Sequence, residues 1–171
     1  GDMIVNAYLV WSEVSRNAWI FDTGTDATQI LGFVKEERLQ VNAIYLTHTH
    51  RDHIACLKEL REETGKPPVC VHHLEALDGC DSISEDFADG CSELSLFARH
   101  THGHSAGGMT YVIDGLKKPV AVVGDALFAG SMGGGMSSYA DALRTNRQKI
   151  MSLSDDTILD RKSTRLNSSH Q

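Results

Sequence analysis

The chain has 171 residues, of which 41% are hydrophobic and 23% charged, a composition typical of one ordinary soluble globular domain with a substantial core. The net charge of -7 argues against a nucleic-acid groove, which needs a basic surface. The sequence has neither an apolar run long enough to cross a bilayer nor a basic-then-apolar leader, so a cytoplasmic location is expected.

The first elements in chain order are two strands and a helix. The β-rich runs 6–11 and 18–22 are separated by a short polar turn and predict a hairpin. Asp26 and Gln29 have the spacing of a capping box. Apolar residues follow at helical spacing, so the sequence predicts a helix from this box to about Arg38.

The next elements alternate between strand and helix. Residues 41–47 predict a third strand, and residues 53–65 predict a single helix that Gly65 closes. Pro67 and Pro68 cannot continue that helix, so a fourth strand is expected directly after them. This order of elements is typical of an α/β domain.

The second half of the chain is dominated by strands. Residues 74–92 are acidic with interspersed glycine and give no clear prediction. Ser138 with Asp141 predicts the start of a last helix, which carries Leu143 and Ile150 on one face. Three further strands are expected, over residues 92–100, 108–114 and 119–125. Two hairpins among mixed elements favour an α/β sandwich of mixed sheets over a doubly wound parallel sheet.

The end of the chain differs from the rest. It has no apolar period, and it follows DDTIL, which predicts the start of a strand. One codon choice for Asp160 to His170 resembles a widely used sequencing adapter translated in frame, and a natural disordered tail is the alternative. We expect one domain over residues 1–159 and a non-native tail over residues 160–171, which is left out of the fold prediction.

The segment YLTHTHRDH, residues 45–53, has three histidines and an aspartate directly after an apolar run. His48 and His50 are two apart, so an extended backbone points both side chains the same way. Asp52 and His53 follow a turn and approach the same space from the start of a helix. Taken singly, Asp52 is a good helix N-cap and a histidine at a strand end usually meets solvent. Together the four side chains predict a site for zinc, iron or manganese.

This H-x-H-x-D-H pattern resembles the metallo-β-lactamase superfamily, and the resemblance runs through nearly all of residues 4–159. FDTG is similar to the family's D-T-G turn, in which Asp22 would support a ligand. THGHSAG is similar to the segment with the third histidine ligand, which by position is His104, and His102 is the weaker candidate. VVGDALFAG is similar to the segment whose aspartate, Asp125, bridges two metals. The di-zinc lactamases proper use a cysteine near that point, so Asp125 argues against β-lactam hydrolysis.

The resemblance implies both a fold and a ligand set. The fold is a metallo-β-lactamase-like αββα sandwich of two mixed sheets flanked by helices, with the C-terminal strand and helix missing. Two Zn²⁺ ions are implied, with Fe or Mn as alternatives, about 3.5–4 Å apart and sharing a water whose pKa falls to about 7. Asp52 would also orient or deprotonate that water. The implied ligands are His48, His50 and His104 on one metal, Asp52 and His53 on the other, and Asp125 between them.

The family normally adds one more histidine, in a P-G-H-G turn after a strand that resembles DDTIL. Here the chain reaches Leu159 and then continues into the expected tail. Nothing around His170 resembles that turn, so His170 is not assigned as the ligand. We therefore expect the first metal to bind well and the second to bind poorly.

GDALFAGSMGGG is most similar to the glyoxalase II-like hydrolases, which cleave thioesters. Those enzymes typically carry an arginine where this chain has residues 133–135, and their glutathione-binding C-terminal part is absent. The implied activity is hydrolysis of a thioester, lactone or other ester, with a small molecule as partner rather than nucleic acid or membrane. One alternative is a persulfide dioxygenase-like oxidoreductase with a single iron on His48, His104 and Asp125. Another is a non-catalytic metal-binding remnant.

Three other patterns are given simpler explanations. GHSAG fits a nucleophile elbow with Ser105 as nucleophile, but that elbow needs a helix after it and a strand is predicted there. GSMGGG, residues 130–135, lacks the G-K-S/T of a phosphate-binding loop and is expected to form a flexible active-site rim. His72, His73 and His100 lack ligand spacing and are expected to be structural or surface residues.

Overall fold

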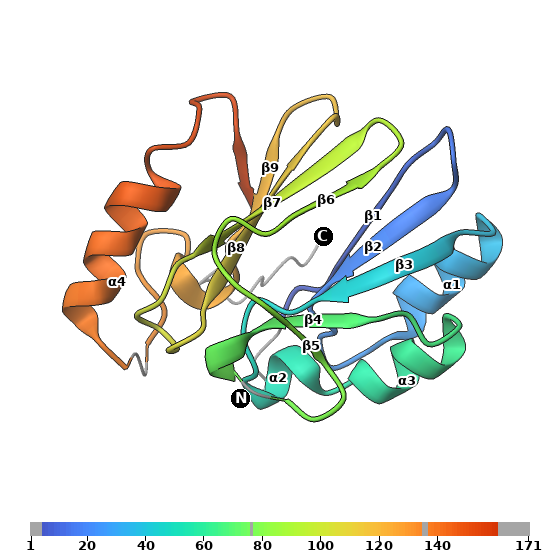
Figure 1. Ribbon diagram of the computed structural model, residues 1–171, viewed down its shortest axis with the longest axis horizontal. Helices are drawn as coiled ribbons and strands as arrows, with labels where there is room; N and C mark the ends of the chain where they lie inside the picture. Colours follow the sequence, from blue (N-terminus) through green and yellow to red (C-terminus); the bar gives the residue numbers. More distant parts are fainter. Residues whose placement is uncertain (1–4, 76, 135–136, 161–171) are drawn as a thin grey trace, which may run out of the picture.

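The computed structural model describes residues 5–75, 77–134 and 137–160. The described residues form two five-stranded sheets packed face to face, with helices on the outer sides (Figure 1). This is the αββα sandwich of mixed sheets that the sequence predicts, and the fold class is confirmed.

The first sheet has the order β1-β2-β3-β4-β5. Its first pair is the predicted antiparallel hairpin, and the other three pairs are parallel. The parallel pairs need crossover connections, and two of these carry helices. Its strands are β1 (Tyr8–Trp11), β2 (Asn17–Phe21), β3 (Gln40–Tyr45), β4 (Val69–His72) and β5 (Asp81–Ile83).

The second sheet has the order β10-β9-β8-β7-β6. Its first four strands along the chain pair antiparallel, and the last strand pairs parallel to β9. Residues 74–92, for which the sequence gives no clear prediction, contain β5 and β6 and cross from one sheet to the other. The strands are β6 (Ala88–Cys91), β7 (Leu94–His100), β8 (Met109–Asp114), β9 (Val120–Val122) and β10 (Ile158–Asp160).

The last strand includes a residue that the sequence analysis assigns to the tail. Asp160 pairs in register with Val122, and the Tyr8 hydroxyl donates a hydrogen bond of 2.9 Å to Asp160 Oδ1. The remainder of the expected tail, residues 161–171, lies outside the described residues. The domain boundary at residue 159 therefore stays a prediction.

Helix α1 (Thr28–Glu36) begins one residue later than the capping box predicts, because its N-cap is Ala27, and Asp26 instead accepts a hydrogen bond of 2.9 Å from the Thr28 amide. The helix expected over residues 53–65 is two short helices, α2 (Arg51–Ile54) and α3 (Leu57–Glu63). The chain leaves helical geometry between them at Cys56, which a continuous apolar period cannot indicate.

Helix α4 (Tyr139–Thr145) begins as predicted, with Ser138 Oγ accepting a hydrogen bond of 3.2 Å from the Asp141 amide. Leu143 and Ile150, predicted to share one face of this helix, differ in exposure at 36% and 1%, and Ile150 lies beyond the end of α4. The helix passes into a π-helical turn over Asn146–Ile150, which changes the angular spacing of its side chains.

Alternating side chains of the first sheet supply two different cores. Trp19 and Phe21 face the second sheet, where Phe21 stacks on Tyr45 with 5.6 Å between ring centroids. Ile20 points the opposite way and packs under the helices together with Leu60. Both faces of β2 are therefore covered, as its run of apolar residues requires.

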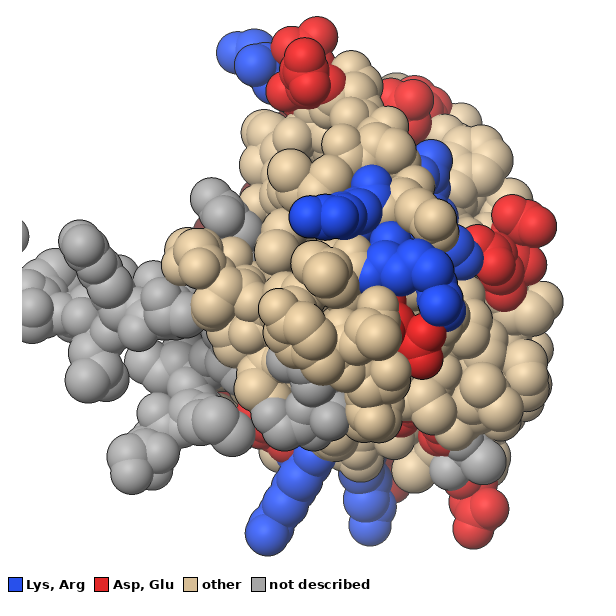
Figure 2. Space-filling model, turned by 90° about the vertical axis from the view of Figure 1, so that its left-hand side faces the viewer, with Lys and Arg blue, Asp and Glu red and all other residues tan. Residues whose placement is uncertain are grey.

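The side of the molecule that carries α4 has a mixed charge. Figure 2 shows a group of basic side chains there with acidic side chains beside it. Arg144 pairs with Asp141 on the helix, and Lys149 pairs with Glu85. Among the described residues, no helix has the length and apolar character that a membrane span requires.

The two sheets are joined at one end of the sandwich. The Tyr111 hydroxyl donates a hydrogen bond of 2.7 Å to the Leu46 carbonyl, and the Met109 amide donates one of 2.8 Å to the Thr47 carbonyl. These bonds hold the end of β3 against the start of β8. The loops that follow β3, β7 and β9 therefore meet at the same end of the molecule.

Candidate metal centre

The histidines of the H-x-H segment lie where β3 ends and α2 begins. His48 is 2% exposed, and His50 is the N-cap residue of α2 and is exposed. Their ring centroids are 4.4 Å apart. The two side chains therefore share one space, as their spacing of two predicts.

His104 reaches the same space from the other sheet, in the loop between β7 and β8. Its Nε2 lies 3.0 Å from Nδ1 of His50, although the two residues are 54 positions apart in the chain. One ring nitrogen of each of His48, His50 and His104 lies within 4.8 Å of the others. The same loop runs into β8 without a helix, so Ser105 does not sit in a nucleophile elbow.

A second group shares one histidine with the first. Ligand atoms of His48, His53 and Asp125 also lie within 4.8 Å of one another. Asp125 lies in the turn Gly124–Ala126 after β9, with Oδ1 at 3.2 Å from His53 Nε2 and Oδ2 at 3.7 Å from His104 Nε2. The carboxylate therefore contacts imidazoles of both groups, and its role as a bridge between two metals stays a prediction.

Asp52 is the one predicted ligand outside both groups. It is the second residue of α2 and is half-buried, and the N-cap of that helix is His50. The simpler explanation, that Asp52 caps the helix, is therefore wrong. Its role as a ligand or as a proton acceptor stays a prediction.

Asp22 is buried, at 1% exposure, and supports the site through contacts with Thr47 and His53. Its Oδ1 accepts from the Thr47 amide at 2.7 Å, and its Oδ2 accepts from Thr47 Oγ1 at 2.8 Å and lies 2.8 Å from His53 Nδ1. Since the carboxylate only accepts, His53 carries a proton on Nδ1 and turns Nε2 toward Asp125. Burial opposes a charge on His53, but its bonds to Asp125 and Asp22 raise its pKa to about 9 in the metal-free protein.

The proton position on His48 follows from the same network. Thr47 Oγ1 donates to Asp22, so it can only accept from His48 Nδ1, which lies 3.1 Å away. Burial, followed by repulsion from the imidazoles of His53, His50 and His104, lowers the pKa of His48 to about 2. His48 is thus neutral, with its Nε2 lone pair free toward the other histidines.

The donor set fits a divalent metal ion. His48 Nε2 is buried and has no hydrogen-bond partner among the described residues, and such an orphan group is costly unless a ligand satisfies it. Beside His48, His104 and Asp125 lies a space of about 10 Å³, about one water-sized sphere. Neutral imidazoles around a carboxylate are the ligands that zinc, iron and manganese accept.

Gly133 lies directly against these ligands. A Cβ atom on Gly133 would be 2.1 Å from the Asp125 carbonyl oxygen and 3.0 Å from His104 Nδ1. A side chain at this position would therefore displace the two ligands. The glycine-rich stretch is predicted to form a flexible rim, and no sequence pattern indicates this close contact. Gly135 lies outside the described residues.

Four other histidines form a row beside the centre. His72 stacks on His100 with 4.1 Å between ring centroids, and His73 and His102 extend the row at 4.2 Å and 4.6 Å. Their rings stack or tilt against one another, and among the described residues they form no group of converging ligand atoms. His72 is buried, and its Nδ1 accepts a hydrogen bond of 3.2 Å from the Leu74 amide, which agrees with a structural role.

The row of four histidines predicts that the folded protein loses stability at acid pH. Burial, and then repulsion from His100 and His73, lowers the pKa of His72 from 6.5 to about 4. The unfolded chain therefore binds this proton more readily than the folded one, and stability is lost as the pH falls from 6.5 toward 4. In the His72→Asn variant the amide oxygen still accepts from Leu74, and we expect a flatter dependence of Tm on pH in this window. Equal slopes for the metal-free wild type and variant would contradict this.

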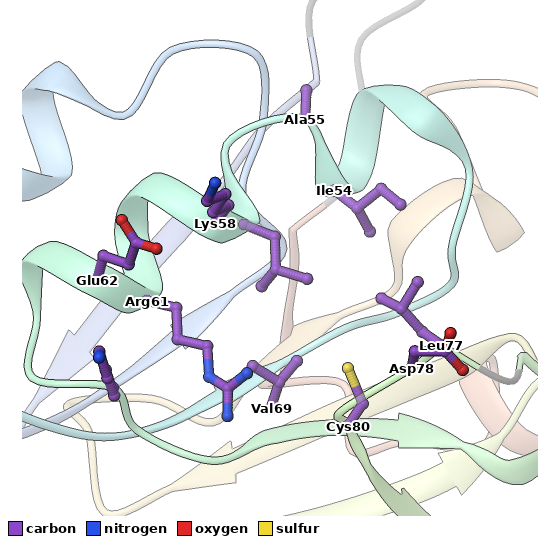
Figure 3. Close-up of a pocket in the computed structure, with 11 residues that line it drawn as sticks. Ile54, Ala55, Lys58, Arg61, Glu62, Val69, Leu77, Asp78 and Cys80 are labelled. Atoms are coloured by element: carbon purple, nitrogen blue, oxygen red, sulfur yellow. The ribbon is translucent and has the colours of Figure 1, made fainter.

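A larger cleft of about 550 Å³ lies elsewhere, between helices α2 and α3 and the segment before β5 (Figure 3). Arg61 and Cys80 line it, with Ile54 and Leu77 as apolar neighbours. None of the predicted metal ligands contributes to its lining. The cleft and the metal centre are therefore separate features.

Comparison with known proteins agrees with this centre. Residues 1–79 match the metallo-β-lactamase superfamily model. The probable metallo-hydrolase YqgX of Bacillus subtilis is 29% identical over 93% of this chain and 84% of its own length. The hydroxyacylglutathione hydrolase of Citrobacter koseri is 34% identical over 90% of this chain, which spans only 60% of that relative.

The crystal structure of the B3 metallo-β-lactamase BLEG-1 has a TM-score of 0.79 and 28% identity, over 95% of this chain and 87% of that one. The chain carries a metallo-β-lactamase superfamily domain.

Proposed function

We propose that this domain is a metal-dependent hydrolase that acts on a thioester, a lactone or another ester. The observation that carries the proposal is the convergence of imidazoles from both sheets around the Asp125 carboxylate. The relatives support it, since one is named a hydroxyacylglutathione hydrolase and another a probable metallo-hydrolase. A small-molecule substrate and a cytoplasmic location belong to the same proposal.

The proposed ligands divide as the two groups do. His48, His50 and His104 would hold the first metal, His53 would hold the second, and Asp125, which contacts imidazoles of both groups, would serve both. Asp52 is proposed as a further ligand of the second metal. Zn²⁺ is the proposed ion, with Fe or Mn as alternatives. When bound, such ions supply hydroxide at neutral pH and stabilise the oxyanion that forms.

The chain's own residues prepare the centre for this chemistry. Asp22 and Thr47 hold protons on Nδ1 of His53 and His48, and the Nε2 atoms face the centre. Nε2 of His48 has a free lone pair, whereas His53, whose pKa of about 9 keeps it protonated in the metal-free protein, has to release its Nε2 proton to become a ligand. Asp52, half-buried on α2, is proposed to orient the attacking water and accept its proton. These groups are in place before any substrate binds, which limits the reorganisation that the reaction requires.

The metal stoichiometry gives one test. The first group has three imidazoles, whereas the second shares His48 with it and otherwise has His53 and Asp125. We therefore expect one tightly bound Zn²⁺ per chain after dialysis and a second that binds only in excess Zn²⁺. Elemental analysis and chelator competition measure both values. Two ions of equal affinity would contradict the expectation.

The activity is tested on a substrate panel with the Zn²⁺-loaded and the chelator-treated protein. The panel holds an S-acylglutathione thioester, a homoserine lactone, an aryl ester and a β-lactam. We expect metal-dependent turnover of one of the first three and none of the β-lactam. Metal uptake without turnover of any member would favour a non-catalytic metal-binding remnant.

A single-iron oxidoreductase is the second candidate. It is favoured by the contact of His104 with Asp125, which together with His48 makes a set of two histidines and one carboxylate. This candidate predicts one iron per chain in aerobically purified protein, and oxygen consumption with a persulfide of glutathione. Zinc in the purified protein without oxygen consumption would exclude it.

A further inference from the structure

Glu75 is a buried carboxylate that the sequence analysis does not identify. It ends the short turn His73–Glu75 after β4 and is 9% exposed. We propose that Glu75 is a positioning residue that joins the two loops carrying the predicted ligands of the first metal. The proposal rests on the metal centre proposed above and adds a residue to which no role is yet assigned.

Each oxygen of Glu75 serves a different loop. Oε2 accepts hydrogen bonds from the Thr49 amide at 3.1 Å and from Thr49 Oγ1 at 2.7 Å. Oε1 accepts a hydrogen bond of 2.8 Å from the Gly107 amide. Thr49 stands between His48 and His50, and Gly107 stands three residues after His104. One side chain thus links the H-x-H segment of the first sheet to the third imidazole on the second.

The three partners are all donors, which selects a carboxylate over an amide. A glutamine at this position would have to turn its NH₂ group toward either Thr49 or Gly107, where a second donor already points. Burial alone would raise the pKa of Glu75, but the hydrogen bonds from Thr49 and Gly107 lower it below its usual value. The side chain is therefore ionised at neutral pH, and its bonds are charge-assisted.

The close approach of Gly107 shows that the contact is tightly fitted. A Cβ atom on Gly107 would be 2.5 Å from Glu75 Cγ and 3.0 Å from His72 Nδ1. Only a residue without a side chain lets the carboxylate reach the backbone amide here. Gly107, three residues after His104, is therefore part of the same link between the two ligand-bearing loops.

The first test is Zn²⁺ affinity in the Glu75→Gln variant, measured by chelator competition. Loss of a partner bonded directly to a ligand costs about 10- to 100-fold in metal affinity. Glu75 bonds the ligand-bearing loops through Thr49 and Gly107, so a decrease at the low end of that range is expected. Glu93→Gln is the control, because Glu93 also accepts a side-chain hydrogen bond, from Ser12 at 2.7 Å, but is exposed and bonds no ligand loop. Wild-type affinity in a folded Glu75→Gln variant would overturn the proposal.

A milder pair of variants keeps the test decisive if Glu75→Gln does not fold. Thr49→Val removes the hydroxyl that donates to Glu75 and keeps the backbone donor, and Thr49→Ser retains both. We expect Thr49→Val to weaken Zn²⁺ binding by about 3- to 10-fold, the equivalent of one hydrogen bond. Thr49→Ser is expected to restore the affinity. Equal affinities for the two variants would overturn the proposal.

Hydrogen exchange in the metal-free protein separates this inference from the proposed function. Glu75→Gln is expected to speed amide exchange in both loops, residues 47–50 and 101–108, while Glu93→Gln leaves both unchanged. If the wild type binds no Zn²⁺, the proposed function fails and the exchange data still test the junction. Unchanged exchange in both loops of a folded variant would overturn the role of Glu75 whatever the affinities show.

Discussion

Replacing His104 with alanine is expected to abolish tight binding of the first Zn²⁺ and to leave the fold intact. His104 is the only imidazole of the first group that comes from the second sheet, and without it His48 and His50 remain as a two-ligand site. The loss should exceed about 100-fold in affinity, beyond what removal of an outer partner costs. Isothermal titration with Zn²⁺ measures the affinity, and circular dichroism checks the fold.

His102→Ala is the matched control for this variant. His102 lies two residues away in the same loop, but its Nε2 lies 3.3 Å from Arg144 and it joins neither ligand group of the described residues. We expect wild-type Zn²⁺ affinity in His102→Ala. If this variant instead lost the metal and His104→Ala kept it, the ligand assignment in this loop would be wrong.

The residues of the site could be predicted from the sequence where the ligands lie close together in the chain. His48 and His50 lie two residues apart behind a strand, and this spacing alone indicates that their side chains converge. His104 and Asp125 were assigned through family motifs, since no periodicity links loops that meet only after both sheets have packed. Glu75 carried no such signal, because its partners are amide and hydroxyl groups 26 and 32 positions away.

The same distinction applies to the fold. The longer strands with apolar side chains were predictable, as β3 and β8 show. β5 and β6 are three and four residues long and mostly exposed, with one buried residue each. Such strands form because a neighbouring strand offers its backbone groups, and their own sequence gives little apolar pattern. The break between α2 and α3 likewise coincides with tertiary contacts, since the Cys56 amide donates to Thr23 Oγ1 and the Thr23 amide donates to the His53 carbonyl.

Replacing Asp22 with alanine is expected to destabilise the metal-free protein more than any other single change considered. The variant leaves the Thr47 amide and hydroxyl, both buried, and His53 Nδ1 without their acceptor. Removal of one partner from such a buried pair costs about 3–5 kcal/mol. Asp22 also has a φ of 52°, which aspartate tolerates better than alanine. Urea unfolding measures the change in the free energy of unfolding.

Asp26→Ala provides a comparison for Asp22→Ala. Asp26 is exposed and accepts one hydrogen bond, from the Thr28 amide, so its loss should cost far less than the loss of the buried Asp22. Equal losses in the two variants would contradict the role of the buried network. A second chemical change, Asp22→Asn, keeps the size of the side chain and removes its charge, but its NH₂ group must face either the Thr47 amide or the Thr47 hydroxyl and His53. The pH dependence of its effect therefore has to separate the ion pair with His53 from the bonds to Thr47.

The ion pair between Asp22 and His53 also makes the free energy of unfolding depend on pH. Burial opposes the charge on His53, yet Asp125 and Asp22 raise its pKa from 6.5 to about 9. The folded protein therefore binds this proton more tightly than the unfolded chain. The stability it contributes is fully present below pH 6.5 and is lost as the pH rises through about 9. The difference in unfolding free energy between wild type and Asp22→Asn should thus be largest near pH 6.5 and shrink toward pH 9.5. A constant difference across this range would show that the carboxylate supports Thr47 alone.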